Sequence, residues 1–338
     1  MASTRDIAIL GAGDLLAEAL TIQLQAQEST TGRVRLFTTD EELSLVDIDG
    51  EEWLVDDLEE FEPSGFRYVF IAAADEAFES LAEDNESEGT LFLDVCGMYS
   101  DDASVPRISA WMGAESRVEA ARSGLVTLPG AQCAQLAAVL APLQVAFGVE
   151  RIEVTGLNAV SAYGRAAVEE LATQTRDLLT FRSITQNVFS GQIAFNVLPA
   201  IGDFDEEGSA ALEKKVSEEL AAAMPGLPAP GLTFVQVPVF YGDTQIVSVE
   251  LHQSADLARI LEVLAQSADL SVLDWREEGH YPSPVTEASG EDRVVVGRIR
   301  LQGGNPRRLQ LCSAADNLRF GLALQGARIA DLLEKEYI

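Results

Sequence analysis

Cysteine and histidine, the side chains that thiolate catalysis and most zinc sites use, are scarce in this 338-residue sequence. The sequence has three cysteines, Cys96, Cys133 and Cys312, and two histidines, His252 and His280. The cysteines show no paired spacing, so we expect neither a disulfide framework nor a tetrahedral zinc site. We therefore predict no metal centre and a reducing compartment, the cytoplasm.

A glycine turn near the N-terminus is the first candidate binding motif. The segment IAILGAGDLLAEAL (7–20) reads as a strand, a turn and a helix that begins near Asp14. Gly11 and Gly13 would let a phosphate approach the backbone amides at the helix N-terminus. The same turn also serves any tight strand-to-helix junction, so this motif alone leaves both interpretations open. A carboxylate at Asp14 would compete with an incoming pyrophosphate.

The pattern of the first 130 residues indicates the fold that carries this turn. Apolar runs bounded by turns alternate with helical patterns, which predicts parallel strands joined by crossover helices in a Rossmann-like, doubly wound α/β sheet. These runs are residues 7–10, 34–37, 68–73, 90–94 and 125–128. A carboxylate-rich segment, residues 40–62, keeps alternating apolar positions, so we expect a small strand-rich excursion with an acidic face.

After Pro142 the pattern changes to long strands with fewer helices, which predicts an α+β domain with a mostly antiparallel sheet. The expected strands are 151–162, 234–241, 245–252, 292–302 and 307–315, and the expected helices are 164–179 and 206–224. We predict a first domain over 1–130, a second over 131–315, and a C-terminal helical segment, 316–338, that packs back on the first domain.

Composition excludes several classes of partner. A sequence with 47% hydrophobic and 23% charged residues is globular, and its net charge of −32 repels nucleic acid and anionic lipid alike. The most apolar stretch, residues 133–149, contains two glutamines and Pro142, so we expect a buried helix and no membrane span. The first ten residues, MASTRDIAIL, fit a first strand and not a signal peptide.

Ordered strings along nearly the whole sequence resemble the bacterial aspartate-semialdehyde dehydrogenases, most of all the divergent Usg-type branch of that family. They are IAILGAG (7–13), LPGAQCAQLAAVLAPL (128–143), ERIEVTGLNAVSAYGRAAVEELATQT (150–175), IAFNVLP (193–199), VPVFYGDTQIVSVE (237–250), SPVTEASGEDRVVVGRIR (283–300) and ADNLRFGLAL (315–324). The resemblance implies a dinucleotide-binding domain, a dimerisation domain and thiolate chemistry on an aldehyde. In that chemistry, hydride passes to NADP and phosphate releases the acyl group.

The resemblance also indicates that the nucleophile is missing. Counting back from Pro142 along the family motif places its Pro-Asn-Cys on Pro129, Gly130 and Ala131. An alanine offers no lone pair, so a thiohemiacetal cannot form there. Cys133 lies two positions further on, about 200° around the helix. It remains a fallback nucleophile, since a helix N-terminus can lower a thiol pKa, whereas a buried structural cysteine is the commoner case.

The family's proton-handling histidine aligns with Asp243, and its substrate-clamping arginine aligns with Gln236. We expect Asp243 to have an ordinary pKa near 4, which would make it a poor acid at neutral pH. Replacing arginine by glutamine removes a bidentate, charged contact with a carboxylate. Asn158 stands where the family has its active-site glutamine.

The phosphate and cofactor sites are altered as well. Ser100 stands where the family has a phosphate-binding arginine, and Lys214 matches its other phosphate cation. Gly11, Gly13 and Asn317 match cofactor-binding positions. However, the acidic stretch after the second strand would repel a 2′-phosphate. We expect no required cofactor, and weak binding of NAD or NADP stays open.

The leading hypothesis is a non-catalytic homodimer that binds a small molecule or a protein partner of unknown identity, with neither nucleic acid nor membrane as a partner. Arg298 is expected at the subunit interface. The alternative is an active NAD(P)-dependent aspartate-semialdehyde dehydrogenase that uses Cys133 as nucleophile and Asp243 as base. A third reading, new chemistry in the old site, has Asp243 and Tyr163 as reactive groups without assigned roles.

Overall fold

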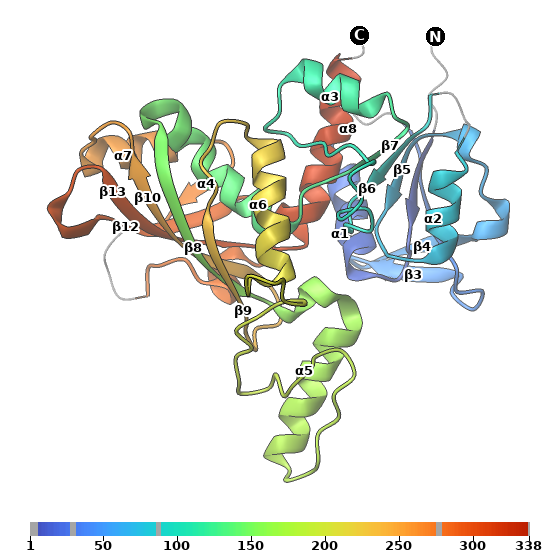
Figure 1. Ribbon diagram of the computed structural model, residues 1–338. Helices are drawn as coiled ribbons and strands as arrows, with labels where there is room; N and C mark the ends of the chain where they lie inside the picture. The colour runs from blue at the N-terminus through green and yellow to red at the C-terminus, as the bar shows by residue number, and fades with distance from the viewer. Residues whose placement is uncertain (1–5, 28–31, 86–88, 275–278, 337–338) are drawn as a thin grey trace. The chain divides into compact units, whose positions relative to one another are not determined.

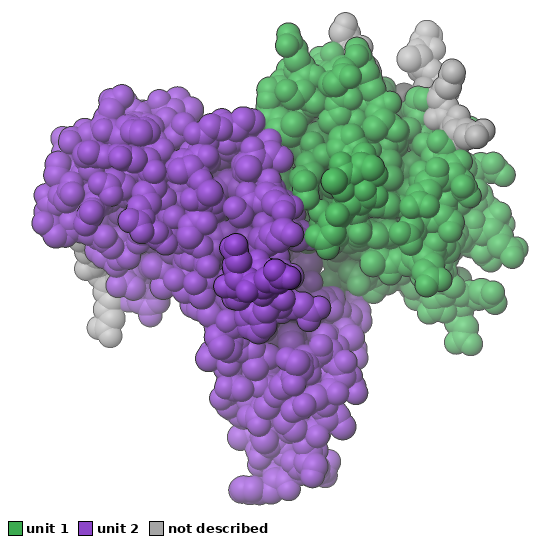
Figure 2. All heavy atoms as spheres, in the orientation of Figure 1, with its two compact units in different colours: residues 1–130, 322–338 green, residues 131–321 purple. Residues whose placement is uncertain are grey.

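The computed structural model describes residues 6–27, 32–85, 89–274 and 279–336. The chain divides into two compact units, which Figure 2 draws in different colours. Unit 1 comprises residues 1–130 and 322–338, and unit 2 comprises residues 131–321.

Unit 1 is built on a seven-stranded sheet in the order β3-β4-β2-β1-β5-β6-β7. The strands are β1 (Asp6–Leu10), β2 (Val34–Thr38), β3 (Leu45–Ile48), β4 (Glu51–Asp57), β5 (Phe66–Ile71), β6 (Leu91–Asp94) and β7 (Leu125–Thr127). Every neighbouring pair is parallel except β3 and β4. The predicted Rossmann-like parallel sheet is confirmed.

The carboxylate-rich segment forms the antiparallel hairpin β3–β4, as its alternating apolar positions predicted. Asp49 and Gly50 make its turn with φ angles of 53° and 82°, and an Asp-Gly turn of this kind matches the twist of the flanking strands. Val46 and Ile48 are buried on one side of β3, whereas Asp47 between them is exposed. The excursion therefore has the expected acidic face.

The helices of unit 1 are α1 (Leu15–Gln25), α2 (Glu76–Glu83), α3 (Ala114–Ala121) and α8 (Leu324–Glu336). Helix α8 packs against α1 and α3 (Figure 1). It approaches the sheet closely at Gly326, where a β-carbon would lie 2.8 Å from Val95 Cγ1. Near its end, the Arg117 guanidinium forms an ion pair with Glu336. Residues 322–336 are thus part of unit 1, whereas residues 316–321, which were predicted to belong with them, lie in unit 2.

Unit 2 is built on a six-stranded sheet in the order β11-β12-β13-β10-β8-β9. The strands are β8 (Val149–Asn158), β9 (Gly231–Gln236), β10 (Asp243–Leu251), β11 (Leu270–Val272), β12 (Val294–Leu301) and β13 (Arg308–Ala315). Only the two edge pairs, β11–β12 and β8–β9, are parallel. The expected mostly antiparallel sheet is confirmed.

The strand predicted over 234–241 was wrong at its end, because β9 stops at Gln236. Pro238 follows two residues later and has no backbone N–H to continue a ladder. Gly242 then turns the chain with a φ of 86°. This early ending brings Asp243 to the start of β10.

Helices α4 (Ala131–Phe147), α6 (Ala211–Ala223) and α7 (Leu257–Ala265) pack against this sheet. Helix α4 contacts β8, β10, β12 and β13, and every residue from Ala131 to Leu140 is buried. Within the described ranges, no helix has both the length and the apolar character needed to cross a bilayer. Helix α5 (Gly164–Leu179) and the chain that returns beside it project beyond the sheet of unit 2 (Figure 1).

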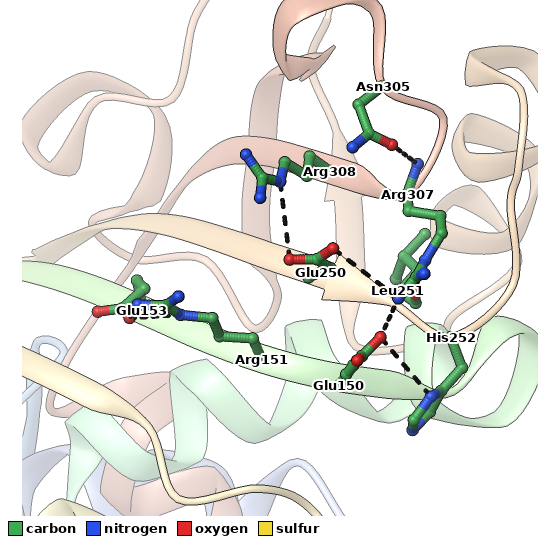
Figure 3. A network of polar contacts seen from close by, with 9 residues as sticks. All are labelled: Glu150, Arg151, Glu153, Glu250, Leu251, His252, Asn305, Arg307 and Arg308. Atoms are coloured by element: carbon green, nitrogen blue, oxygen red, sulfur yellow. Dashed lines mark hydrogen bonds and ion pairs between the residues drawn. The ribbon is translucent and has the colours of Figure 1, made fainter.

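Charged side chains gather at one end of the sheet of unit 2 (Figure 3). The Arg307 guanidinium pairs with Glu150, and Arg308 lies 3.6 Å from Glu250 on the neighbouring strand. Arg151 and Glu153 on β8 form a third pair, 2.7 Å apart. Most of these side chains are a third or more exposed, so each pair adds little stability.

Candidate functional site

Three positions that resemble altered active-site residues lie side by side in unit 2. The parallel register of β8 and β9 pairs Asn158 with Gln236. The antiparallel register of β8 and β10 pairs Leu157 with Thr244, which places Asp243 beside Asn158 on the other side. All three residues are 2% exposed. A cross-strand row of one acid and two amides, Gln236–Asn158–Asp243, therefore occupies this end of the sheet.

Asp243 is held by hydrogen bonds to both of its oxygens. The backbone N–H of Ala159 donates to Oδ1 at 2.8 Å, and Gln132 Nε2 donates to Oδ2 at 2.8 Å. Burial raises the pKa of the Asp243 carboxyl to about 7, with a further increase from the charge of Asp316, although both hydrogen bonds lower it. The expected ordinary pKa near 4 was wrong, because sequence alone does not reveal complete burial.

The head of α4 lies against this row. Gln132 reaches Asp243 with its side chain, and its backbone oxygen accepts a hydrogen bond from Gln245 Nε2 at 2.8 Å. The preceding residue, Ala131, is 6% exposed and fits tightly against Gly321, where an added β-carbon would lie 2.5 Å from the alanine methyl. Ala131 occupies the expected nucleophile position, and Asp243 occupies the expected base position. The hydrogen bond from Gln132, the neighbour of Ala131, to Asp243 brings these two positions close together.

Cys133 is fully buried within α4. Desolvation raises the pKa of its thiol well above the ordinary value, and the charge of Glu219 raises it further. The helix N-terminus does not lower the thiol pKa in this setting, contrary to the possibility that kept Cys133 as a fallback nucleophile. A thiol of this kind forms almost no thiolate near neutral pH, and the thiolate is the reactive species.

The amides of the site make contacts within the protein. Gln236 donates from Nε2 to the Asn158 backbone oxygen at 2.9 Å. Asn317 Oδ1 accepts from Ser161 Oγ and from the Gly242 N–H, both at 3.0 Å. Gln236 Oε1 and Asn317 Nδ2 are buried without a hydrogen-bond partner among the described residues. Gln236 therefore links β9 to β8, and Asn317 links Ser161 to Gly242.

The two expected phosphate residues lie in different units. Ser100 is buried in unit 1, in the turn after β6, where its backbone oxygen accepts from Arg107 Nη2 at 2.7 Å. Lys214 is exposed on α6 in unit 2. Sequence reasoning missed Arg107, which brings a cation to the backbone of Ser100 from seven positions further along the chain. Only the folding of this loop brings them together.

The glycine turn is explained by contacts within unit 1. Gly11 has a φ of 107°, and a β-carbon there would lie 2.7 Å from Ala73 Cβ. Gly13 has a φ of 92°, and a β-carbon there would lie 2.9 Å from Leu43 Cδ2. The Asp14 carboxylate caps α1 by accepting the Leu16 N–H at 3.0 Å. An N-terminal amide that could hold a pyrophosphate is therefore already bonded.

An acidic hollow of about 380 Å³ lies at the end of β2 in unit 1. Its carboxylates come from Asp40, Glu41, Asp56, Asp57 and Glu59. In a Rossmann-like sheet the adenine ribose rests near the end of the second strand. These residues do not fit the 2′-phosphate of NADP, because like charges repel. For metals, the described part of the chain contains no group of three or more His, Cys, Asp or Glu side chains that could hold an ion.

Comparisons with known proteins agree with this architecture. The family model for the semialdehyde dehydrogenase dimerisation domain matches residues 140–320. A USG-1 protein homolog of Pseudomonas aeruginosa is 32% identical, and aspartate-semialdehyde dehydrogenase 2 of Vibrio cholerae is 29% identical, each over 100% of both chains. The structure of the Vibrio cholerae aspartate semialdehyde dehydrogenase II complexed with ASA has a TM-score of 0.90, with 29% identity and full coverage of both chains. A probable aspartate-semialdehyde dehydrogenase from Pseudomonas aeruginosa has a TM-score of 0.89 with 31% identity, over 99% of this chain and 100% of that one.

Proposed function

Because this chain belongs to the aspartate-semialdehyde dehydrogenase family, we propose that it is a non-catalytic member that acts as a dimeric binding or interaction protein. The observation that carries the proposal is the side chain at the head of α4. A methyl group, that of Ala131, stands beside the Gln132–Asp243 pair. Without a nucleophile there, the aldehyde chemistry of the family has no first step.

Cys133 is a poor substitute for the missing thiol. Its side chain is fully buried, and burial raises its pKa, so neither access nor a thiolate is available to an aldehyde. This argument weighs against the alternative function, an active NAD(P)-dependent aspartate-semialdehyde dehydrogenase that uses Cys133.

Asp243 is better placed to carry a proton than its residue type suggests, since burial raises its pKa to about 7. Both of its oxygens nevertheless accept hydrogen bonds from the protein, and the residue is 2% exposed. We infer that it holds the head of α4 against β8 and β10. Asn158 beside it belongs to the same degenerate site.

Binding of the family's charged substrate loses its main contacts. Gln236 cannot provide the bidentate charge that an arginine offers to a carboxylate, and Ser100 supplies no charge to a phosphate. Lys214 is left as an exposed surface cation. The ligand is therefore an unidentified small molecule or protein with other chemistry, and the charge of −32 excludes nucleic acid.

No cofactor is required in this proposal. The capped start of α1 and the carboxylates after β2 both oppose a dinucleotide, and NADP more strongly than NAD because of its extra phosphate. We propose that the turn of Gly11 and Gly13 retains at most weak binding of NAD.

The protein is proposed to act as a homodimer in the cytoplasm. The dimerisation-domain family model matches most of unit 2. Arg298 on β12 is exposed and has a φ of 52°, a conformation uncommon for side chains other than glycine. We place this exposed arginine at the interface of the proposed dimer.

A direct assay tests the absence of catalysis. The purified protein is incubated with aspartate semialdehyde, NADP and phosphate, and reduced cofactor is followed beside a catalytic relative. We expect no phosphate-dependent turnover. Turnover that disappears in Cys133→Ala would establish the alternative, and turnover that survives it would establish new chemistry in the site. Calorimetric titration with NAD and NADP measures the residual cofactor binding, with NADP expected to be the weaker ligand.

A further inference from the structure

Strands β2 and β4 of unit 1 are paired over only part of their length. Their parallel ladder begins at Leu36–Val55, although both strands begin earlier in the chain. Continued backwards, the same register would set Arg33 beside Glu52. The two chains instead line an open hollow of about 520 Å³ at this place. The sheet therefore forks, and β2 and β4 supply the walls of the hollow.

The hollow lies at the end of the sheet away from the glycine turn. Arg33 and Arg35 stand at the start of β2, whereas Gly11 follows the end of β1, which runs parallel to β2. Dinucleotides bind Rossmann-like sheets at the carboxyl ends of the strands. All residues that line the hollow belong to unit 1. The hollow is therefore separate from the expected cofactor position and from the Gln236–Asn158–Asp243 row.

Positive charge is concentrated in this hollow. Arg33 and Arg35 are the two basic residues between positions 6 and 66 of the sequence, and both line it. Arg35 is held by Asp56, whose Oδ2 accepts a hydrogen bond from Nε at 2.7 Å, and by the ring of Phe37, 5.0 Å from the guanidinium carbon. Within the described residues, no hydrogen bond engages the Nη groups of Arg35. These groups are donors for an anion.

Arg33 and Glu52 carry opposite charges on the two walls of the hollow. Both side chains are exposed, and neither forms an ion pair with another described residue. The register of the β3–β4 hairpin sets Asp47 directly opposite Glu52, and like charges in that arrangement repel. A positive group of a ligand is therefore attracted to the β4 wall, and a negative group to the β2 wall.

Apolar surface adjoins these charges. Leu54, two positions from Glu52 on the same side of β4, is 69% exposed, and Trp53 and Leu24 line the hollow as well. Leu54 faces Leu45 across the hairpin, so its neighbour is also apolar. Ligand pockets combine an apolar lining with a few polar groups that fix the orientation of the ligand. Opposite charges beside exposed apolar surface fit a small zwitterion with an apolar body.

We propose that this hollow binds a free α-amino acid with an apolar side chain. Its carboxylate lies against Arg33 and Arg35. Its ammonium lies toward Glu52, and its side chain packs on Leu54. The volume of the hollow falls in the range of about 300–1,000 Å³ that ligand pockets show. The assignment gives the proposed binding role a class of ligand and rests on that role, whereas the proposed absence of catalysis rests on residues of unit 2.

Ligand-observed NMR on the full chain at low salt tests the proposal with three probes. L-Leucine carries both charges, N-acetyl-L-leucine lacks the ammonium, and L-leucinamide lacks the carboxylate. We expect saturation transfer to L-leucine with a dissociation constant of about 1 mM or below, and binding at least ~10-fold weaker for each analogue. Equal binding of N-acetyl-L-leucine would show a simple anion site, and equal binding of L-leucinamide a simple cation site. Either result would overturn the proposal.

Two substitutions test the position of the site. Arg33→Gln and Glu52→Gln each change an exposed side chain, so the fold should tolerate both. The matched controls are Arg122→Gln and Glu119→Gln, which remove the same charges from an exposed ion pair at the end of α3, outside the hollow. We expect each hollow variant to raise the dissociation constant for L-leucine at least ~10-fold, and each control to leave it unchanged.

Three further outcomes would contradict the proposal. Absence of saturation transfer at about 10 mM L-leucine would show that the hollow takes no such amino acid. Binding that Arg33→Gln and Glu52→Gln leave unchanged would place the amino acid elsewhere, and a loss that the controls share would be a general effect of charge. The turnover assay with aspartate semialdehyde decides the catalytic question independently, so failure of the amino-acid site is distinguishable from failure of the non-catalytic assignment.

Discussion

Replacing Asp243 by asparagine should change how the stability of unit 2 depends on pH. The carboxyl is 2% exposed and accepts hydrogen bonds from the Ala159 N–H and from Gln132 Nε2. An asparagine keeps an oxygen for the Ala159 N–H. If the side-chain amide of Gln132 rotates by half a turn, its oxygen can accept a hydrogen bond from the new NH₂ group. Both hydrogen bonds can then persist. The substitution therefore removes a titrating group with little change in packing.

The magnitude follows from the pKa of this carboxyl. Burial raises it from 3.8 to about 7, so the unfolded chain loses the proton at a lower pH than the folded chain does. The stabilising contribution of the protonated form is complete below about pH 4, falls as the pH rises, and is lost once the pH passes about 7. At 1.36 kcal/mol per pKa unit, the loss is on the order of 4 kcal/mol.

The difference in stability between Asp243→Asn and the wild type should therefore grow in favour of the variant between about pH 4 and pH 7, and should level off at higher pH. Native-state hydrogen exchange of the β10 amides measures it within unit 2, and the ratio of variant to wild type cancels the intrinsic effect of pH on exchange. Glu169→Gln, an exposed carboxylate on α5, is the control and should show no trend. A difference for Asp243→Asn that stays constant across this range would show that the folded protein keeps the carboxylate ionised throughout.

Three further changes test the packing of unit 2. Iodoacetamide at pH 8 should label Cys133 in the native protein at least ~100-fold more slowly than after unfolding, because its thiol is buried and has a raised pKa. Mass spectrometry of the labelled peptides gives the two rates, and comparable rates would contradict the burial. Glu170→Ala should lower the free energy of unfolding by about 2–3 kcal/mol, since it leaves the backbone N–H groups of Asn187 and Val188 unpaired. Denaturant unfolding measures the loss, and the Glu170→Gln variant should lose less. Gly321→Ala should lower the free energy of unfolding by about 1–3 kcal/mol, because the new methyl group clashes with Ala131. Calorimetry should show this as a lower Tm, and adding Ala131→Gly should recover part of the decrease. If the effects of the two substitutions simply add in the double variant, the contact is disproved.

Local patterns predicted much of the architecture because they depend on residues close together in the chain. Alternating apolar runs predicted the parallel sheet of unit 1, and helical periodicity predicted α5 with the bounds Gly164–Leu179 that the structure shows. Alternation within the acidic segment predicted the β3–β4 hairpin. The end of β9 was missed because an apolar run continues through Pro238, where the ladder cannot.

The candidate site depends on contacts between distant segments, so the sequence left its properties open. The residue types at Ala131, Asp243 and Gln236 were visible at once, and they establish which chemical groups are missing. Only the tertiary structure placed Asn158 between Gln236 and Asp243, covered the row with α4, and buried Cys133. The pKa of a side chain is set by the solvent that folding removes from around it and the donors that folding brings to it. An ordinary pKa for Asp243 and a lowered one for Cys133 were therefore reasonable from the sequence and wrong in the fold.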